Sequence, residues 1–297
     1  MMQTQIEEFL RFLAVEKGYS KHTIAAYRND LTQFLAYLAD EIVSSWEGVE
    51  RAHIMNYIIY LKEREYASST VARKVAGVKS FFHFLVADAV LSDDPTAAVD
   101  SPPVDRPLPH PLSPEEMARL LAETAKSNTP RALRDRAMLE LMYATGMRVS
   151  EVVGLTVDSV DLEAGTARCL GKGNKERLLP LYERAREALG VYLKDGRARL
   201  LQGREITALF VNHRRRPLTR QGLWLIVKAY AAAAGIEREV TPHVFRHSFA
   251  THMLDGGAGL RELQQLLGHA SISSTQVYTE ISARRKREAY DEAHPRA

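Results

Sequence analysis

A short proline-rich stretch limits the fold of this chain more than any other feature. Residues 101–111 read SPPVDRPLPHP and contain five prolines in eleven residues. Proline has no amide hydrogen to donate and disfavours helix in the residue before it, so neither a helix nor a sheet can run through this stretch. It predicts an extended linker between two domains, residues 1–100 and 112–297, and the chain is long enough to give each domain its own core.

The composition is that of a soluble globular protein, with 45% hydrophobic and 26% charged residues. The single cysteine, Cys169, excludes an intrachain disulfide and is typical of a reducing compartment, so we expect a cytoplasmic protein. The sequence has no apolar run of 18 residues, and its N-terminus is polar. We therefore expect neither a membrane span nor a signal peptide.

The net charge of +3 is small but unevenly divided along the chain. Residues 1–100 carry 10 Lys and Arg against 14 Asp and Glu, whereas residues 101–297 carry 30 against 23. A basic excess in the second domain favours a partner rich in phosphate, such as DNA. An ordinary solvated surface gives the same composition, so the charge alone does not show that the domain binds DNA.

The first hundred residues predict a bundle of four amphipathic helices. Apolar residues recur at helical spacing within 9–13, 24–38, 54–61 and 71–85, which gives each helix one face for a shared core. Basic residues near the second helix and off the apolar stripe of the fourth are either solvated charges or DNA contacts. The residues that we single out as DNA contacts here are Lys21, His22, Arg73, Lys74 and Lys79.

The second domain predicts mostly helices with a small antiparallel sheet. Helices are expected from a cap at Ser113, over 134–144 and over 223–234. Strands are expected over 166–170, 176–181 and 209–212. The first two strands form a hairpin whose glycine-rich turn carries Lys172. The basic residues after the third strand are further candidate DNA contacts, namely Arg214, Arg215 and Arg220.

Polar side chains gather between residues 241 and 278. Thr241 and Pro242 suit the start of a helix that carries His243 and Arg246 three residues apart, on one face. A second helix of regularly spaced leucines ends at Gly268, with His269 on the turn beyond it. A third helix, beginning at residue 271 or 273, then carries Tyr278, nine residues after His269.

These residue types suit attack on a phosphodiester. Arginine offers a planar fork of donors that matches phosphate oxygens, and histidine moves protons near neutral pH. A tyrosine hydroxyl has an ordinary pKa of about 10, so as a nucleophile it needs cationic neighbours. Taken singly, each of these residues is more often structural than catalytic, and it is their grouping that favours a site.

The motifs resemble those of the tyrosine recombinases. The H-x-x-R of His243 and Arg246, the L-G-H ending at His269 and the later tyrosine are similar to box II of that family. The stretch ATGMRVSEVVGL at 144–155 resembles box I, and LGKGNKERLLPL at 170–181 resembles the hairpin with the active-site lysine. The similarity is greatest to the bacterial Xer recombinases, and the final HPRA is typical of their XerD branch. All six catalytic positions are occupied, by Arg148, Lys172, His243, Arg246, His269 and Tyr278.

The resemblance implies a fold and a mechanism. It implies a SAM-like core-binding domain and a mixed α/β catalytic domain that ends in a tail helix. Tyr278 would attack the scissile phosphate and form a 3′-phosphotyrosyl link, Arg148 and Arg246 would hold the non-bridging oxygens, and Lys172 would protonate the leaving oxygen. The two histidines would assist proton transfer and hydrogen-bond the phosphate. No cofactor or metal is expected, and the sequence has neither a Walker A loop nor a carboxylate cluster for two metal ions.

The resemblance also implies partners. They are double-stranded DNA with a dif-like site, a XerC-type recombinase or a second copy of the chain in a tetramer, and an FtsK-type translocase. Three alternatives stay open: a type IB topoisomerase, an integrase of a mobile element, and a non-catalytic DNA-binding protein on the same scaffold. The compact length argues against the first two, and the full catalytic set argues against the third.

The tail after Tyr278 is too short to form a domain. Residues 282–293 suit a helix with few apolar residues, which must dock on something to be stable. Docking on its own domain is one alternative. By resemblance to the family, we expect the tail to pack on a neighbouring subunit instead and to link four protomers.

Overall fold

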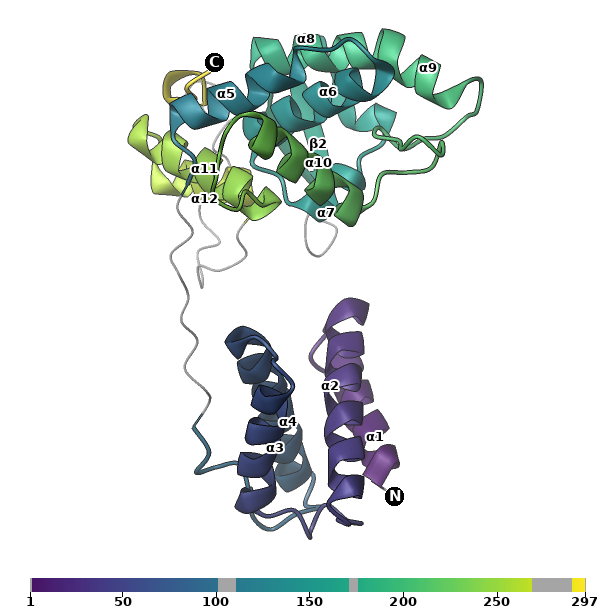
Figure 1. The fold of residues 1–297 in the computed structure, drawn as a ribbon, viewed down its shortest axis with the longest axis vertical. Helices are drawn as coiled ribbons and strands as arrows, with labels where there is room; N and C mark the ends of the chain where they lie inside the picture. The colour runs from purple at the N-terminus through teal and green to yellow at the C-terminus, as the bar shows by residue number, and fades with distance from the viewer. Residues whose placement is uncertain (1, 101–110, 171–175, 269–289, 297) are drawn as a thin grey trace. The chain divides into compact units, whose positions relative to one another are not determined.

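The structure, a computed structural model, describes residues 2–100, 111–170, 176–268 and 290–296 (Figure 1). The chain divides into two compact units, Met1–Leu108 and Pro109–Ala297. The division falls within the proline-rich stretch. Residues 101–110 lie outside the described residues, so an extended conformation for them stays a prediction.

The N-terminal unit contains the four predicted helices. They are α1 (Met2–Val15), α2 (Lys21–Asp40), α3 (Arg51–Glu63) and α4 (Ser68–Ala87). Ser20 caps α2, its side chain accepting a hydrogen bond from the Thr23 amide. The apolar faces meet in a core rich in aromatic rings, which includes Trp46 from the connection between α2 and α3. Trp46 is 1% exposed and donates its indole hydrogen to the Met2 carbonyl oxygen at 3.3 Å.

A buried ion pair links α2 to α4. Asp30 is 3% exposed and lies 2.9 Å from the ammonium group of Lys74, while the more exposed Arg73 also pairs with its carboxylate. The prediction that Lys74 lies off the buried face of its helix is therefore wrong: it is 7% exposed. The sequence pattern missed this because a lysine can fill an interior position when a carboxylate is buried opposite.

We expect Asp30→Ala to lower the free energy of unfolding by about 3 kcal/mol, because it leaves the Lys74 charge buried without its carboxylate. Lys74→Met should cost less, because Asp30 keeps Arg73 as a partner. Urea unfolding of the full chain, followed by tryptophan fluorescence in a Trp224→Phe background so that Trp46 reports alone, measures both variants. Equal losses for the two would contradict this account of the pair.

The C-terminal unit is built around α6 (Pro130–Thr145), which is buried on nearly every side. Helices α5 (Pro114–Thr124), α8 (Glu183–Val191) and α11 (Pro242–Asp255) and the π-helical turn η2 (Tyr192–Arg197) pack against it (Figure 1). Helix α6 begins four residues earlier than predicted because Thr129 caps it and a proline follows.

The remaining helical elements complete the unit. They are α7 (Val149–Val153), η1 (Val157–Ser159), α9 (Ala198–Leu201), α10 (Arg220–Ala233) and α12 (Leu260–Leu267). The caps predicted from sequence are present at Ser113, Thr241 and Gly268. A mainly α-helical fold with a small antiparallel sheet is confirmed. No helix among the described ranges has the length and apolar character needed to cross a membrane.

The sheet has the antiparallel order β1-β2-β3. It consists of β1 (Val160–Asp161), β2 (Thr166–Leu170) and β3 (Glu176–Pro180), with Arg168 opposite Leu178 and Leu170 opposite Glu176. The predicted hairpin is confirmed, but the predicted strand over 209–212 is wrong.

The segment predicted as a strand uses its backbone in other ways. The Leu209 carbonyl oxygen accepts from the Tyr192 hydroxyl at 3.0 Å, and the Val211 carbonyl oxygen accepts from the Arg134 guanidinium at 3.1 Å. Val211 pairs with the chain only through an isolated bridge to Pro217. Buried side chains therefore satisfy the carbonyl groups that a ladder would use.

The end of the tail packs on its own unit. Tyr290, Ala293 and His294 are each at most 5% exposed, and the His294 Nε2 donates to the Tyr143 carbonyl oxygen at 3.1 Å. The Arg296 guanidinium lies 3.0 Å from a carboxylate oxygen of Glu140 on α6. Residues 290–296 thus show docking on the chain's own unit, the first of the two alternatives, while packing of the tail on a neighbouring subunit in an assembly stays a prediction. Residues 269–289 lie outside the described part of the chain.

Acid should release this tail end. Burial lowers the pKa of His294 to about 4, and the Arg296 charge adds to the effect. An undocked tail, with an ordinary histidine pKa near 6.5, takes up the proton first, so docking is unchanged above that pH and weakens between pH 6.5 and 4. Between pH 7 and pH 5 the loss is about 2 kcal/mol.

We expect carboxypeptidase to remove C-terminal residues faster at pH 5 than at pH 7, relative to a free peptide of the same sequence. His294→Gln should reduce this pH dependence, because glutamine can donate to the Tyr143 carbonyl without titrating. His252, whose pKa burial also lowers, titrates in both proteins. An unchanged pH dependence in the variant would show that His294 does not control docking.

Candidate active site

Three of the six predicted catalytic residues lie within the described structure. They are Arg148, Arg246 and His243. The other three, Lys172, His269 and Tyr278, lie outside the described residues, and their roles stay predictions.

Arg148 is placed by the end of α6. Gly146 caps that helix with a left-handed φ of 59°, and a Cβ there would lie 2.3 Å from the ring of Phe249. The chain turns sharply at this glycine, and Arg148 follows in extended conformation at the cap of α7. Its guanidinium lies 3.0 Å from a carboxylate oxygen of Glu151, whose other oxygen accepts the Arg148 amide at 2.7 Å.

Arg246 projects from α11 onto the same turn. Its guanidinium donates to the Gly146 carbonyl oxygen at 2.6 Å and to the Leu267 carbonyl oxygen at 2.8 Å. The first bond fixes the turn just before Arg148, and the second fixes the end of α12. Burial, together with the nearby charge of Arg148, lowers the pKa of Arg246 to about 10, so it stays protonated at neutral pH.

His243 is exposed on the first turn of α11, three residues before Arg246 and on the same face. The structure therefore brings Arg148, Arg246 and His243 to one region, formed by the ends of α6 and α12 and the start of α11. This is the grouping that the sequence motifs predict.

The sequence motifs do not identify one further residue of the site, Arg177. Arg177 on β3 lies 3.0 Å from a Glu151 oxygen and donates to the Leu267 carbonyl oxygen at 3.1 Å. Strand alternation was the available signal, because it places Arg177 on the same face as the buried Leu179. The hairpin motif alone assigns this strand only to the support of the turn.

The site is strongly positive. Three guanidinium groups, from Arg148, Arg177 and Arg246, lie around the single carboxylate of Glu151. Burial raises the pKa of Glu151, but the Arg148 amide and the two arginine charges outweigh this, and the pKa falls below its usual value. The carboxylate is therefore ionised and offsets one of three positive charges. The remaining charge suits an anion with several oxygens, such as a phosphodiester.

The predicted DNA contacts of the N-terminal unit differ in their exposure and in whether they already pair with other groups of the protein. Lys21 and His22 are exposed at the start of α2. Arg73 is exposed but pairs with Asp30, and Lys74 is buried. Lys79 donates to a backbone carbonyl, that of Val99, at 2.7 Å. Lys74 is thus a structural residue, and the others stay predictions.

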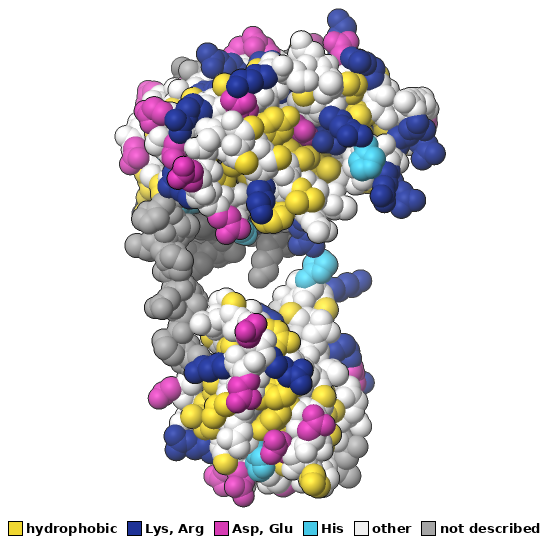
Figure 2. Space-filling model, viewed as in Figure 1, with side chains coloured by type: hydrophobic (Ala, Val, Ile, Leu, Met, Phe, Trp, Pro, Cys, Tyr) yellow, Lys and Arg dark blue, Asp and Glu magenta, His cyan; other side chains and the backbone are white. Residues whose placement is uncertain are grey.

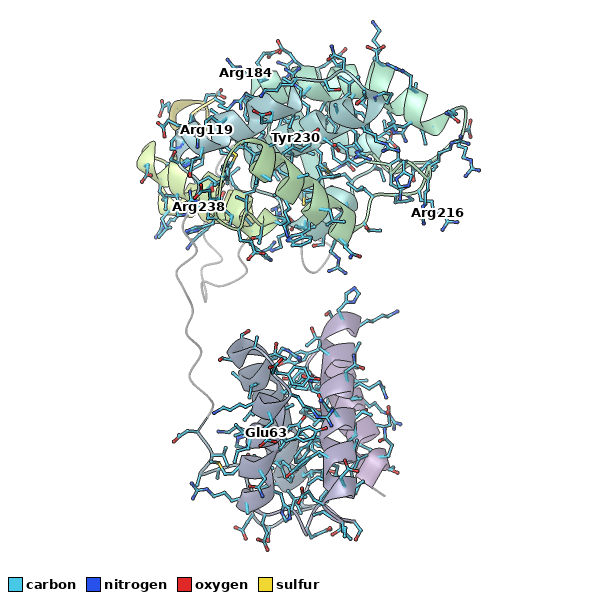
Figure 3. The ribbon with its side chains drawn as sticks, viewed as in Figure 1. Glu63, Arg119, Arg184, Arg216, Tyr230 and Arg238 are labelled. Carbon is cyan, nitrogen blue, oxygen red and sulfur yellow. The ribbon has the colours of Figure 1, made fainter. Side chains whose placement is uncertain are left out.

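The predicted contacts of the C-terminal unit lie on one turn and the helix after it. Arg214 and Arg220 are exposed, and Arg215 bonds the side chain of Gln202. Arg216, in the same turn, projects from the edge of the unit (Figure 3). Lys and Arg side chains gather at this edge in the space-filling view (Figure 2).

Both units match known families. Residues 111–285 match the family described as phage integrase family, and residues 6–89 match the phage integrase N-terminal SAM-like domain. The chain is 51% identical over 283 residues to tyrosine recombinase XerC of Roseiflexus sp., covering 95% of this chain and 90% of that protein. It is 43% identical over 300 residues to tyrosine recombinase XerD of Oceanobacillus iheyensis, covering 100% of each.

A solved structure supports the fold. The crystal structure of XerH site-specific recombinase bound to a palindromic difH substrate matches with a TM-score of 0.71 and 23% identity, covering 96% of this chain and 83% of that one. Because relatives named XerC and XerD are both similar over almost the whole chain, assignment to the XerD branch stays a prediction. The chain belongs to the phage integrase family and, within it, to the Xer tyrosine recombinases, enzymes that exchange DNA strands at specific sites.

Proposed function

We propose that this recombinase resolves chromosome dimers at a dif-like DNA site during chromosome segregation, and that it works in the cytoplasm. The chemistry rests on one observation: Arg246 of α11 donates to the turn just before Arg148, whose guanidinium pairs with Glu151. Such an arrangement can bind a phosphodiester in a fixed orientation. The net positive charge of residues 101–297 supports DNA as the source of that phosphodiester. The chromosomal role rests on the similarity to proteins named XerC and XerD over almost the whole chain.

The two arginines would stabilise the transition state. As a nucleophile adds to the phosphorus atom, negative charge grows on the non-bridging oxygens, and two fixed guanidinium forks can meet that charge without rearranging. Arg246 is held by two carbonyl oxygens and Arg148 by one carboxylate. His243, exposed beside Arg246, is available for proton transfer.

Tyr278 would be the nucleophile, and Lys172 would protonate the leaving 5′ oxygen. The tyrosine oxygen forms a bond to phosphorus as the bond to the 5′ oxygen breaks, which leaves a 3′-phosphotyrosyl ester and a free 5′-hydroxyl. His269 would hydrogen-bond the phosphate. Because the ester replaces one phosphodiester with another, a new 5′-hydroxyl can reverse the step without an added energy source.

Partners follow from the same proposal. The XerH structure contains a palindromic difH substrate, and a palindrome offers two equivalent half-sites to two subunits. We propose that this chain likewise acts on paired half-sites, with a second copy or a XerC-type recombinase, in a tetramer that an FtsK-type translocase can activate. The rival function within the family is integration of a mobile element, which uses the same chemistry at a different DNA site.

We expect Tyr278→Phe to bind a nicked duplex carrying the dif-like site with near-native affinity and to form no covalent adduct. The substitution keeps the ring and deletes only the attacking oxygen. Adducts are scored by denaturing gel, and binding by gel shift. The matched control is Tyr230→Phe, a half-buried tyrosine of the same unit (Figure 3), which should form adduct as the wild type does.

An adduct formed by the Tyr278→Phe variant would reassign the nucleophile. Tyr143, Tyr182 and Tyr290 are poor substitutes, because each is at most 1% exposed. Burial also raises the pKa of Tyr143 and Tyr182 well above the ordinary value. A wild-type chain that forms adduct only on the attachment site of a mobile element, and not on the dif-like site, would favour the integrase function.

We expect Arg148→Lys and Arg246→Lys each to lower the single-turnover cleavage rate by about a hundredfold, because lysine cannot reproduce a bidentate fork. Only Arg246→Lys should also lower the unfolding temperature, since it loses bonds to the Gly146 and Leu267 carbonyl oxygens. Arg184→Lys, on the exposed face of α8, is the control. A rate within threefold of wild type would remove that arginine from the site.

A further inference from the structure

Arg177 lies between the two arginines that the proposed function assigns to the phosphate. Its side chain is 12% exposed, compared with 39% for Arg148. It is therefore largely enclosed, while Arg148 is open to a ligand. A group in this position acts on the reaction mainly through its neighbours.

Arg177 shares an acceptor with each of the other two arginines. One oxygen of Glu151 lies 3.0 Å from the Arg177 guanidinium and 3.0 Å from that of Arg148. The Leu267 carbonyl oxygen accepts from Arg177 at 3.1 Å and from Arg246 at 2.8 Å. Arg177 is thus joined, through one shared atom in each case, to both proposed phosphate ligands.

The shared carboxylate has an electrostatic consequence. A carboxylate paired with Arg148 alone would neutralise most of the charge that Arg148 can offer to a phosphate. A second guanidinium on the same oxygen divides that interaction, so Arg148 keeps more of its charge. Arg177 also donates to the Cys169 sulfur at 3.4 Å, which fixes its side chain against β2.

Gly268 makes room for Arg177. Its φ is 64°, and a Cβ at this position would lie 1.5 Å from a terminal nitrogen of Arg177. The glycine of the L-G-H motif therefore does more than end α12. Its missing side chain is the space through which Arg177 reaches the Leu267 carbonyl, one residue before Gly268 and two before His269.

We propose that Arg177 is a positioning residue for catalysis: it holds Glu151 and the Leu267 carbonyl so that Arg148 and Arg246 present their charge and geometry to the scissile phosphate. The proposal rests on the proposed function of those two arginines. It predicts that loss of Arg177 slows the step in which charge grows on the phosphate, while DNA binding, spread over other surfaces, changes little.

The test compares two scissile linkages in a suicide duplex, which traps the cleaved product. One linkage is the ordinary phosphodiester. The other is a methylphosphonate, in which a methyl group replaces one charged non-bridging oxygen. Less negative charge then grows in the transition state, so less stabilisation by arginine is needed. We expect Arg177→Met to cleave the phosphodiester roughly 10- to 100-fold more slowly than wild type at saturating protein, with an unchanged Kd for the duplex.

On the methylphosphonate the deficit of Arg177→Met should shrink to within about threefold, as should that of Arg148→Met. A fold defect cannot produce this pattern, because a smaller active fraction slows both linkages equally. Arg177→Lys, which keeps the charge but not the fork, should lie between Arg177→Met and wild type. Arg168→Met, an exposed arginine on the neighbouring strand, is the matched control and should cleave both linkages at the wild-type rate.

Equal losses on the two linkages, or no loss on the phosphodiester, would overturn the role of Arg177. Failure of the proposed function gives a different result, because the wild-type chain would then cleave neither linkage.

Discussion

The burial of α6 is the constraint on which the catalytic unit depends. A helix covered on nearly every side needs neighbours around its whole circumference, and α5, α8, α11 and η2 supply them. Its C-terminal end is thereby fixed within the core. Because Arg148 follows only two residues beyond Gly146, the position of this arginine is set by the packing of the helix before it.

The same helix carries charges into the interior, and each has a partner. Arg134 pairs with Asp135 at 2.6 Å and also reaches the Val211 carbonyl. Glu140 accepts from Arg296 and from the Tyr182 hydroxyl. Burying such groups is costly unless they are satisfied, and their bonds fix which segments lie against α6. Specific polar contacts thus complement a core that apolar packing alone would leave less uniquely arranged.

Much of the fold follows from local sequence patterns. Apolar spacing and caps such as Ser20, Thr241 and Gly268 are signals confined to a few residues, and they place most helices to within a turn. The approach of Arg148 to Arg246 was predicted by motif resemblance, since the two lie far apart in the sequence. What local patterns could not give were pairings between distant residues. From sequence alone Lys74 is expected to be a surface charge, and only the structure shows Asp30 opposite it. Arg177 likewise is expected to be an ordinary strand residue, and only the structure shows its contacts with Glu151 and Leu267.

Docking of the tail end on its own unit makes it harder for another molecule to bind the tail. Leu267 is fixed by two arginines, and Tyr290 is buried, so the chain between them is attached to one unit at both ends. Because the tail end and the surface on which it docks belong to one chain, docking is intramolecular and occurs at a high effective concentration. A competing acceptor on another protein must therefore either bind the tail more tightly than Tyr143 and Glu140 do, or be held nearby at a comparable local concentration. Assembly of several subunits on one DNA site would meet the second condition, whereas free encounters at cellular concentrations would not.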